Sequence, residues 1–214
     1  MKSIKLFIAP GACSMSCHIA LEETKTPFEL GKISWAPNDP VREELKKYNP
    51  AGAVPTLVLI EGTDEKTLTQ NSAILEYIAD QKPEAGLLAP AGSWERVQII
   101  RWLSLISADL HKAFSPLFNL QKITQNPDAQ KDIINYQFSQ LDRFFGIINT
   151  QLENNKYLAG KNFSIADAYL FPVYNWAPKV KFPMDKYTAL NQYHARLSQR
   201  PSIQKVMKQE GLAS

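Results

Sequence analysis

The sequence predicts an α/β domain over residues 1–82, a linker over 83–92 and an all-helical domain over 93–214. Two observations lead to this fold class. Short apolar runs typical of strands alternate with helix-like segments in the first part, and strand signals almost vanish in the second part. Between the two parts lies a stretch rich in Pro, Gly and Ala, a composition typical of linkers.

The predicted elements of the first domain come in the order strand, helix, strand, helix, strand, strand, helix, at residues 4–8, 14–23, 28–33, 41–48, 56–60, 66–69 and 72–80. The first strand ends at the turn signal Ala9-Pro-Gly, and Glu61-Gly-Thr-Asp64 suits the turn of an antiparallel hairpin. Asn71 stands directly before the last helix, where its side chain is expected to cap free backbone amides.

The second domain is predicted to consist of amphipathic helices. From Trp94 onward, apolar residues recur every three or four positions, which predicts one helix face made of Val97, Ile100, Leu103, Ile106, Leu110, Phe114 and Leu117. A second long helix begins at Asn126-Pro127-Asp128, because Pro suits the first helical position. A third begins at Ser164-Ile-Ala-Asp167, whose hydroxyl and carboxylate can accept hydrogen bonds from free amides. Two shorter helices are divided by Arg200-Pro201.

The composition is that of an ordinary globular protein, with 44% hydrophobic and 21% charged residues among 214. The formal charge is only +3, and Lys and Arg are spread along the chain, so nucleic acid is not an expected partner. No segment approaches the ~20 apolar residues that a membrane span needs, so a membrane is not expected either. A charge inside the first apolar run and the lack of a cleavage site indicate a cytoplasmic location.

Both cysteines lie in one stretch, APGACSMSCHIALEE, at positions 13 and 17, and His18 follows them. Dithiol oxidoreductases place two residues between their cysteines, whereas three lie here. In a helix the two Cβ atoms would lie about 5 to 6 Å apart, while a relaxed disulfide needs roughly 3.5 to 4.5 Å. The spacing therefore disfavours a redox pair. A metal site is disfavoured too, because His111 and His194 stand alone and supply no second group of ligands.

Cys13 and Cys17 differ in their expected surroundings. Cys13 follows a Pro-Gly turn and precedes a helix start, where unpaired backbone amides and the helix dipole are expected to lower the pKa of its thiol. Cys17 lies one turn inside the helix beside Ile19 and Ala20, as a buried cysteine without chemistry would. We interpret Cys13 as a candidate nucleophile and Cys17 as a packing residue.

Two further stretches each allow a structural and a functional interpretation. The Val54–Pro55 bond before the third strand is a candidate cis peptide. It is either a rigid strand entry or a way to present the free N–H and C=O of Val54 to an extended peptide. The stretch Thr69-Gln-Asn-Ser-Ala-Ile-Leu-Glu-Tyr77 is either only a capped helix or a helix whose first amides receive a carboxylate.

Three stretches together resemble the cytosolic glutathione transferases: Pro-Gly-Ala-Cys-Ser before the first helix, Asn-Pro-x-Gly-x-Val-Pro, and Ser-Ala-Ile-Leu-x-Tyr at the third helix. In the second domain, Asp109-Leu-His-Lys-Ala-Phe-Ser-Pro-Leu-Phe118 and Phe163-Ser-Ile-Ala-Asp-Ala-Tyr-Leu170 are similar to the bacterial beta class, as is Ala79-Asp-Gln-Lys-Pro83. The resemblance covers nearly the whole chain. It implies a thioredoxin-like N-terminal domain, a helical-bundle C-terminal domain and a homodimer.

The resemblance also implies the residues of the site. Cys13 would face the sulfur of glutathione or form a mixed disulfide with it, and Val54, before Pro55, would pair with the cysteinyl backbone of the tripeptide. The other implied residues are Gln70 and Asn71 at the γ-glutamyl end, and His111 and Lys112 reaching across from the second domain. Without the resemblance, His111 would be a helix histidine of no known role.

Three places depart from the family pattern. An acidic residue followed by Ser or another small residue is common where Gln70 and Asn71 stand, and loss of a solvated ion pair to the ligand ammonium would cost about 1 kcal/mol. Asn38 stands where a lysine commonly meets the glycine carboxylate of glutathione. Ile8 stands where other classes carry a tyrosine, which leaves Cys13 as the group directed at the sulfur.

The predicted function is conjugation of glutathione, as co-substrate and without a metal ion, to hydrophobic electrophiles in detoxification. Disulfide exchange with glutathione through Cys13 is a possible addition. The side chains expected around the electrophile, or equally in the core, are Phe114, Phe118, Tyr169 and Trp176. The alternatives are a non-catalytic ligand-binding or regulatory protein on the same fold and a reductase that depends on Cys17.

Overall fold

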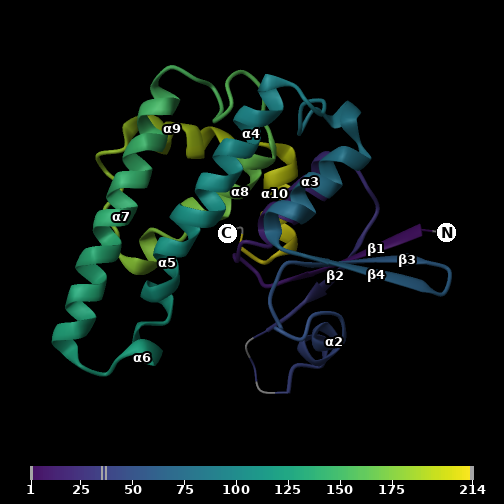
Figure 1. Ribbon diagram of the computed structural model, residues 1–214, viewed down its shortest axis with the longest axis horizontal. Coiled ribbons are helices and arrows are strands. Elements are labelled where there is room, and N and C mark those ends of the chain that lie inside the picture. The colour runs from purple at the N-terminus through teal and green to yellow at the C-terminus, as the bar shows by residue number, and fades with distance from the viewer. Residues whose placement is uncertain (1, 35, 37, 213–214) are drawn as a thin grey trace.

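The computed structural model describes residues 2–34, 36 and 38–212, and its two domains lie side by side in Figure 1. The predicted limits at residues 1 and 214 lie outside the described residues. The first domain contains β1 (Lys2–Ile8), α1 (Met15–Glu23), β2 (Glu29–Lys32), α2 (Pro40–Tyr48), β3 (Thr56–Glu61), β4 (Asp64–Thr69) and α3 (Asn71–Gln81). Each element predicted for this domain is confirmed, with ends that differ by at most two residues.

The described strands form one sheet in the order β2-β1-β3-β4, parallel between β1 and β2 and antiparallel elsewhere. Side chains alternate between its faces. Leu6 and Ile8 pack into the core shared with α1 and α3, whereas Phe7 packs on the other face with Leu45 of α2. Gly31 is paired with Phe7, and a Cβ there would come within 2.5 Å of the Phe7 ring. Glycine therefore permits the close approach of β2 to β1.

The second domain is helical, as predicted. It contains α4 (Trp94–Ser104), a π-helical segment (Leu105–Leu110), α5 (His111–Phe118), α6 (Leu120–Ile123), α7 (Pro127–Glu153), α8 (Ile165–Tyr174), α9 (Thr188–Leu197) and α10 (Pro201–Gln209). Asn126 caps α7 by accepting from the amides of Asp128 and Ala129, and Ser164 and Asp167 form the predicted capping box at α8. Both predicted helix starts are confirmed.

The first long helix of this domain differs from its prediction. Val97, expected on the buried face, is 52% exposed, while Ile99 and Trp102 are buried. A spacing of three or four residues fits more than one face of a helix, and the π-helical turn changes the register further along. The prediction for Val97 is therefore wrong.

The predicted linker is packed against the second domain. It holds a short 3-10 helix at Pro83–Ala85, and the side chains of Leu87 and Leu88 are buried. The carbonyl of Leu87 accepts a hydrogen bond of 3.0 Å from the amide of Ile165 at the start of α8. The segment therefore contributes to the interface between the domains.

Helix α1 forms the centre of that interface, because it contacts α3 within its own domain and both α8 and α10 of the other. Figure 1 shows α8 and α10 between the sheet and the outer helices α5 and α7. Glu210, which follows α10, is thereby brought next to the loop that leads into α1.

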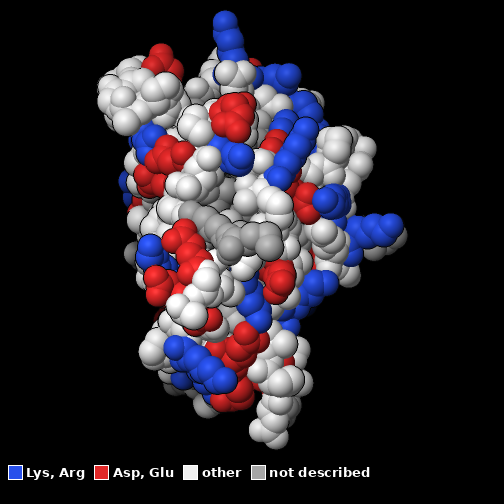
Figure 2. Space-filling view, turned by 90° about the vertical axis from the view of Figure 1, so that its right-hand side faces the viewer, with Lys and Arg blue, Asp and Glu red and all other residues white. Residues whose placement is uncertain are grey.

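No helix among the described residues is long and apolar enough to cross a bilayer. On the face shown in Figure 2, Lys and Arg are interspersed with Asp and Glu, as the even spread of charge along the sequence predicts. This face offers no continuous basic surface of the kind that binds a phosphate backbone.

Candidate active site

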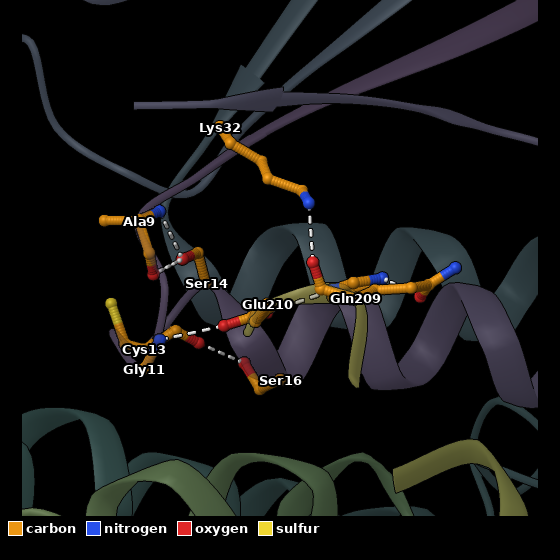
Figure 3. Close-up of polar contacts among 9 residues, drawn as sticks. Ala9, Gly11, Cys13, Ser14, Ser16, Lys32, Gln209 and Glu210 are labelled. Carbon is orange, nitrogen blue, oxygen red and sulfur yellow. Dashed lines mark hydrogen bonds and ion pairs between the residues drawn. The ribbon is translucent and has the colours of Figure 1, made fainter. Parts of the chain in front are cut away.

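Cys13 lies in the short loop between β1 and α1, and the second domain holds this loop by both backbone polar groups of Gly11. Figure 3 shows the contact between Gly11 and Glu210. Gly11, at φ 72°, donates its N–H to Oε2 of Glu210 at 2.8 Å, and its carbonyl accepts from Nε1 of Trp176 at 2.9 Å. The hydroxyl of Ser14 lies 3.2 Å from the amide of Ala9. The loop is therefore fixed before any ligand binds.

Glu210 is in turn paired with His18 of α1. Nδ1 of His18 lies 3.0 Å from Oε1 of Glu210, Nε2 lies 2.8 Å from Oε1 of Gln209, and the imidazole is fully buried. Both ring nitrogens thus have protein partners, so His18 joins α1 to α10. Within the described part of the chain, no three His, Cys, Asp or Glu side chains lie where they could share a metal ion.

The thiol of Cys13 differs from its prediction. Burial raises its pKa to about 11 and outweighs the hydrogen bonds from the amides of Cys13 and Ser14, which lower it. The predicted lowering of this pKa is wrong, because the loss of hydration destabilises the thiolate more than the hydrogen bonds from the two amides stabilise it. Cys17 is fully buried, as expected of a packing residue, and both cysteines are free thiols.

The Val54–Pro55 peptide is cis, which confirms that prediction. The carbonyl of Val54 faces Sγ of Cys13 at 3.5 Å. Asn49 supports this turn, since its Nδ2 donates to the carbonyl of Ala53 and to Oγ1 of Thr56, both at 3.0 Å. The turn and the thiol-bearing loop therefore meet at one point.

Asn71 does not cap α3, so that prediction is wrong. It is the first residue of the helix, while Gln70, at φ 72°, occupies the cap position without a side-chain hydrogen bond. The buried side chain of Asn71 turns toward α1, where Nδ2 lies 2.9 Å from Oγ of Ser16 and Oδ1 lies 3.0 Å from Sγ of Cys17. Asn71 is committed to these partners, whereas Gln70 is exposed.

His111 and Lys112 begin α5, at the end of the π-helical segment. Nδ1 of His111 lies 2.7 Å from the hydroxyl of Tyr169, and its ring meets the Trp176 ring edge-on at 4.7 Å. Burial, with a smaller contribution from the charge of Lys112, lowers the pKa of His111 to about 4. The imidazole is therefore neutral at pH 7.

Two adjoining cavities meet at Cys13. The first, of about 340 Å³, is lined by seven predicted site residues: Cys13, Val54, Pro55, Gln70, Asn71, His111 and Lys112. Asn38 is exposed at φ 61° and is not part of this lining. Polar neighbours outside the set of predicted site residues include Thr69 and Ser72, which belong to the stretch noted before α3, and Ser107, which the sequence did not indicate.

The second cavity, of about 560 Å³, shares Cys13, Ala53, Val54 and His111 with the first. Phe118 and Trp176 line it, as predicted for the electrophile site, together with Pro10 and Lys179. Tyr169 lines the first cavity instead. Phe114 is completely buried and lines neither cavity, and the ring of Phe118 is stacked against it at 6.0 Å, so of the two alternatives Phe114 is a core residue.

Ser107 and Glu210 are among the contributions that were missed from the sequence. Ser107 lies one helical turn before His111, so helical spacing from that residue could have indicated it. Glu210 lies 199 positions from Gly11, and no local signal connects the two.

Comparison with known proteins agrees with this fold and site. The family model for the glutathione S-transferase N-terminal domain matches residues 2–80, and the model for the C-terminal domain matches residues 105–201. Glutathione S-transferase GstA of Escherichia coli O157:H7 is 36% identical over 215 residues, which cover 98% of this chain and 100% of that protein. The chain belongs to the glutathione S-transferase family.

Within the family, its likeness is to bacterial beta-class structures. The beta-class glutathione S-transferase of Sphingomonas chungbukensis is 37% identical, with a TM-score of 0.85 over 98% of this chain and 100% of that one. A sphingomonad glutathione S-transferase complexed with glutathione is 36% identical, with a TM-score of 0.84 over the same shares.

Proposed function

We propose that this protein is a glutathione transferase that conjugates glutathione to hydrophobic electrophiles. The observation that carries the proposal is the meeting of two cavities at Cys13 and His111. The first has the polar lining that a charged tripeptide needs, and the second offers the rings of Phe118 and Trp176 to an apolar molecule. A sulfur placed near Cys13 would reach both.

Glutathione would lie in the first cavity with its cysteinyl backbone along Val54, next to the cis Pro55. Its γ-glutamyl end would lie at Gln70 and the start of α3, and Lys112 would supply positive charge to a carboxylate. Asn71 is proposed to act through its place at the helix start, since its side chain is bonded inside the protein. A contact from Asn38 to the glycine end stays a prediction.

The thiol of glutathione must lose its proton, and its sulfur then bonds to an electrophilic carbon while the leaving group departs with the bonding electrons. Lowering the pKa of that thiol by two units stabilises the thiolate by about 2.7 kcal/mol. Cys13 is itself protonated at neutral pH, because its pKa is raised to about 11, so its S–H would donate to the glutathione thiolate.

The test is turnover of glutathione with an activated aromatic chloride by the purified protein and by Cys13→Ala. We expect Cys13→Ala to lower kcat/KM by up to roughly a hundredfold, the equivalent of about 2.7 kcal/mol, and Cys13→Ser to recover part of it. If the wild type neither turns over nor binds immobilised glutathione, the proposal fails and a non-catalytic protein of the same fold remains. Full activity in Cys13→Ala would leave the enzyme but remove Cys13 from its mechanism.

Disulfide exchange is the second candidate, and the contact between Cys13 and the first cavity favours it. The Cys13 thiolate would attack a glutathione disulfide, forming a mixed disulfide and releasing one glutathione. Mass measurement after incubation with glutathione disulfide tests it, and an adduct that persists in Cys13→Ala would contradict it. A reductase that used both cysteines would also lose exchange in Cys17→Ser.

We also infer a homodimer in the cytoplasm, as the family resemblance implies. Two apolar side chains of α4, Trp94 and Val97, are 70% and 52% exposed, and an interface would remove them from water. Light scattering tests this: the wild type should have the mass of two chains and Trp94→Lys a lower mass. A monomeric wild type would contradict it.

A further inference from the structure

The larger of the two cavities at Cys13, the one proposed for the electrophile, has a charged side chain in its lining. Three titratable residues of the described chain line it: Cys13, His111 and Lys179. The thiol and the imidazole are neutral at pH 7, because burial raises the pKa of Cys13 to about 11 and lowers that of His111 to about 4. The ammonium group of Lys179 is positive. The cavity therefore presents a net positive charge to whatever enters it.

Lys179 reaches this cavity from the short 3-10 helix Pro178–Val180, which follows α8. Its Nζ lies over the backbone of Gly11, where a Cβ would come within 3.3 Å of it. Glycine at position 11 therefore leaves the space that the ammonium group occupies. Trp176 and Glu210 hold the carbonyl and the amide of the same glycine, and Figure 3 shows the second of these contacts. The charge thus lies beside a fixed part of the loop of Cys13.

The charge of Lys179 is not neutralised by an acidic side chain of the described residues, since none of their ion pairs includes it. Glu210 bonds the neighbouring Gly11, but its two oxygens are directed to the Gly11 amide and to His18. The side chain of Lys179 is exposed. Its ammonium group is therefore available to an anion in the cavity.

The apolar part of the cavity is aromatic. The rings of Phe118 and Trp176 meet edge to face with their centroids 5.7 Å apart, and both line the cavity. Such a pair suits a further aromatic ring. Gly11 and Cys13 are two residues apart, so their Cα atoms lie within about 7 Å of each other. A single aromatic ring whose reacting carbon lies near Cys13 can therefore bring an acidic group on its far side toward Lys179.

We propose that Lys179 is a specificity-determining residue that selects aromatic electrophiles carrying a carboxylate. The aromatic ring would pack against Phe118 and Trp176, with its carboxylate at Nζ of Lys179 and its reacting carbon toward the glutathione sulfur near Cys13. This names the substrate class of the proposed function and rests on that function. Lys179 does not line the first cavity, so glutathione would bind without it. It would act on the substrate as a point charge and take no part in the bond changes.

The experiment compares two activated aryl chlorides in the full-length protein. One carries a carboxylate para to the chlorine, and the other carries a carboxamide at the same place. The reacting carbon is the same in both, and in both the glutathione sulfur bonds to that carbon while chloride leaves with the bonding electrons. The quantity measured is the ratio of kcat/KM for the carboxylate to kcat/KM for the carboxamide, at saturating glutathione. A general loss of activity in a variant cancels in this ratio.

We expect Lys179→Gln to lower this ratio about fivefold, the equivalent of the roughly 1 kcal/mol of a solvated ion pair, and Lys179→Glu to lower it further. Added KCl should bring the wild-type ratio toward that of Lys179→Gln, because salt screens the charge. The matched control is Lys181→Gln, which removes the same charge two residues further along, from a side chain that lines neither cavity. It should leave the ratio unchanged.

A ratio that Lys179→Gln leaves unchanged would overturn the proposal while the wild type still conjugates both chlorides, so the transferase would stand without this role for Lys179. A ratio lowered equally by Lys179→Gln and Lys181→Gln would overturn it too, because any nearby positive charge would then have the same effect.

A binding measurement keeps the test independent of turnover. The same carboxylate with hydrogen in place of chlorine cannot react, so calorimetry gives its Kd. We expect Lys179→Gln to raise this Kd about fivefold. If the wild type conjugates neither chloride, the proposed conjugation fails, and the Kd alone decides whether Lys179 binds the carboxylate. An equal Kd in the wild type and in Lys179→Gln would overturn the role of Lys179 in that case as well.

Discussion

Glu210 accepts the N–H of Gly11 at 2.8 Å, across 199 positions of the chain. Its second oxygen meets the buried Nδ1 of His18 at 3.0 Å. Glu210, the residue that follows α10, therefore holds both the loop of Cys13 and helix α1, into which this loop leads (Figure 3). A contact between residues far apart in the sequence thus helps to determine where the thiol of Cys13 lies.

Glu210→Ala is expected to lower the free energy of unfolding by about 3 to 5 kcal/mol, because it leaves Nδ1 of the buried His18 ring and the N–H of Gly11 without their partner. Urea denaturation measures this change. Lys205→Ala is the control, since it removes the exposed ion pair of Lys205 with Glu22 between the same two helices and should cost less than about 1 kcal/mol. Equal losses of unfolding free energy in both variants would contradict the prediction, because they would show that the buried contacts of Glu210 contribute no more than an exposed ion pair.

Alkylation of Cys13 should be slow at neutral pH. Its pKa is raised to about 11, so the thiolate fraction, and with it the rate with iodoacetamide, should rise about tenfold per pH unit between pH 7 and 9. Mass spectrometry of the native protein measures the rate, and Cys13→Ala reports any reaction at the buried Cys17, which should be negligible. A rate that levels off below pH 8 would indicate a thiol of lowered pKa and would contradict this prediction.

Stability should fall as the pH is lowered from about 6.5 toward 4. Burial lowers the pKa of both His111 and His194 to about 4, so the unfolded chain binds protons at a higher pH than the folded one. The stability is complete above the unfolded pKa and is lost below it, by roughly 1 to 3 kcal/mol for each group. In His194→Gln the dependence of the urea midpoint on pH should be shallower. An unchanged slope would contradict this origin.

Asp167 should be among the most sensitive positions of the second domain. Its buried carboxylate accepts from the amides of Leu158 and Ser164 at 3.0 and 2.9 Å and from the hydroxyl of Tyr193 at 2.7 Å. Asp167→Ala leaves these donors unpaired and should cost about 3 to 5 kcal/mol. Thermal unfolding measures it, with Asp128→Ala in the exposed first turn of α7 as the control. A loss below about 1 kcal/mol would refute it.

Phe118→Ala should weaken the binding of the electrophile and leave the binding of glutathione unchanged. The ring lines only the second cavity and is 48% exposed. Loss of its contact should raise KM for an apolar electrophile by roughly fivefold, or about 1 kcal/mol, with KM for glutathione unchanged. Steady-state kinetics with each substrate varied separates the two. Tyr136→Ala, an exposed aromatic of α7, is the control.

Local signals were enough for the elements and for part of the site. The Pro-Gly turn before Cys13, the Val-Pro pair at 54 and 55, and the box from Ser164 to Asp167 depend on neighbouring residues only, and the structure agrees with each. Asn71 shows the limit of such signals. In the sequence it stands just before a predicted helix and looks like the cap of that helix. In the structure its side chain instead bonds to two residues of α1, Ser16 and Cys17.

The sequence by itself determined the order of strands and helices and the two kinds of domain, and it singled out Cys13 rather than Cys17 as the candidate nucleophile, because periodicity, turns and caps act over a few residues. Only the tertiary structure decided the protonation of Cys13 and the partner of His111. Burial determines the protonation of Cys13, since it raises the pKa of the thiol although the neighbouring backbone amides lower it. The partner of His111 is Tyr169, which lies 58 residues away along the chain. Hydration and long-range hydrogen bonds arise only when distant segments pack together.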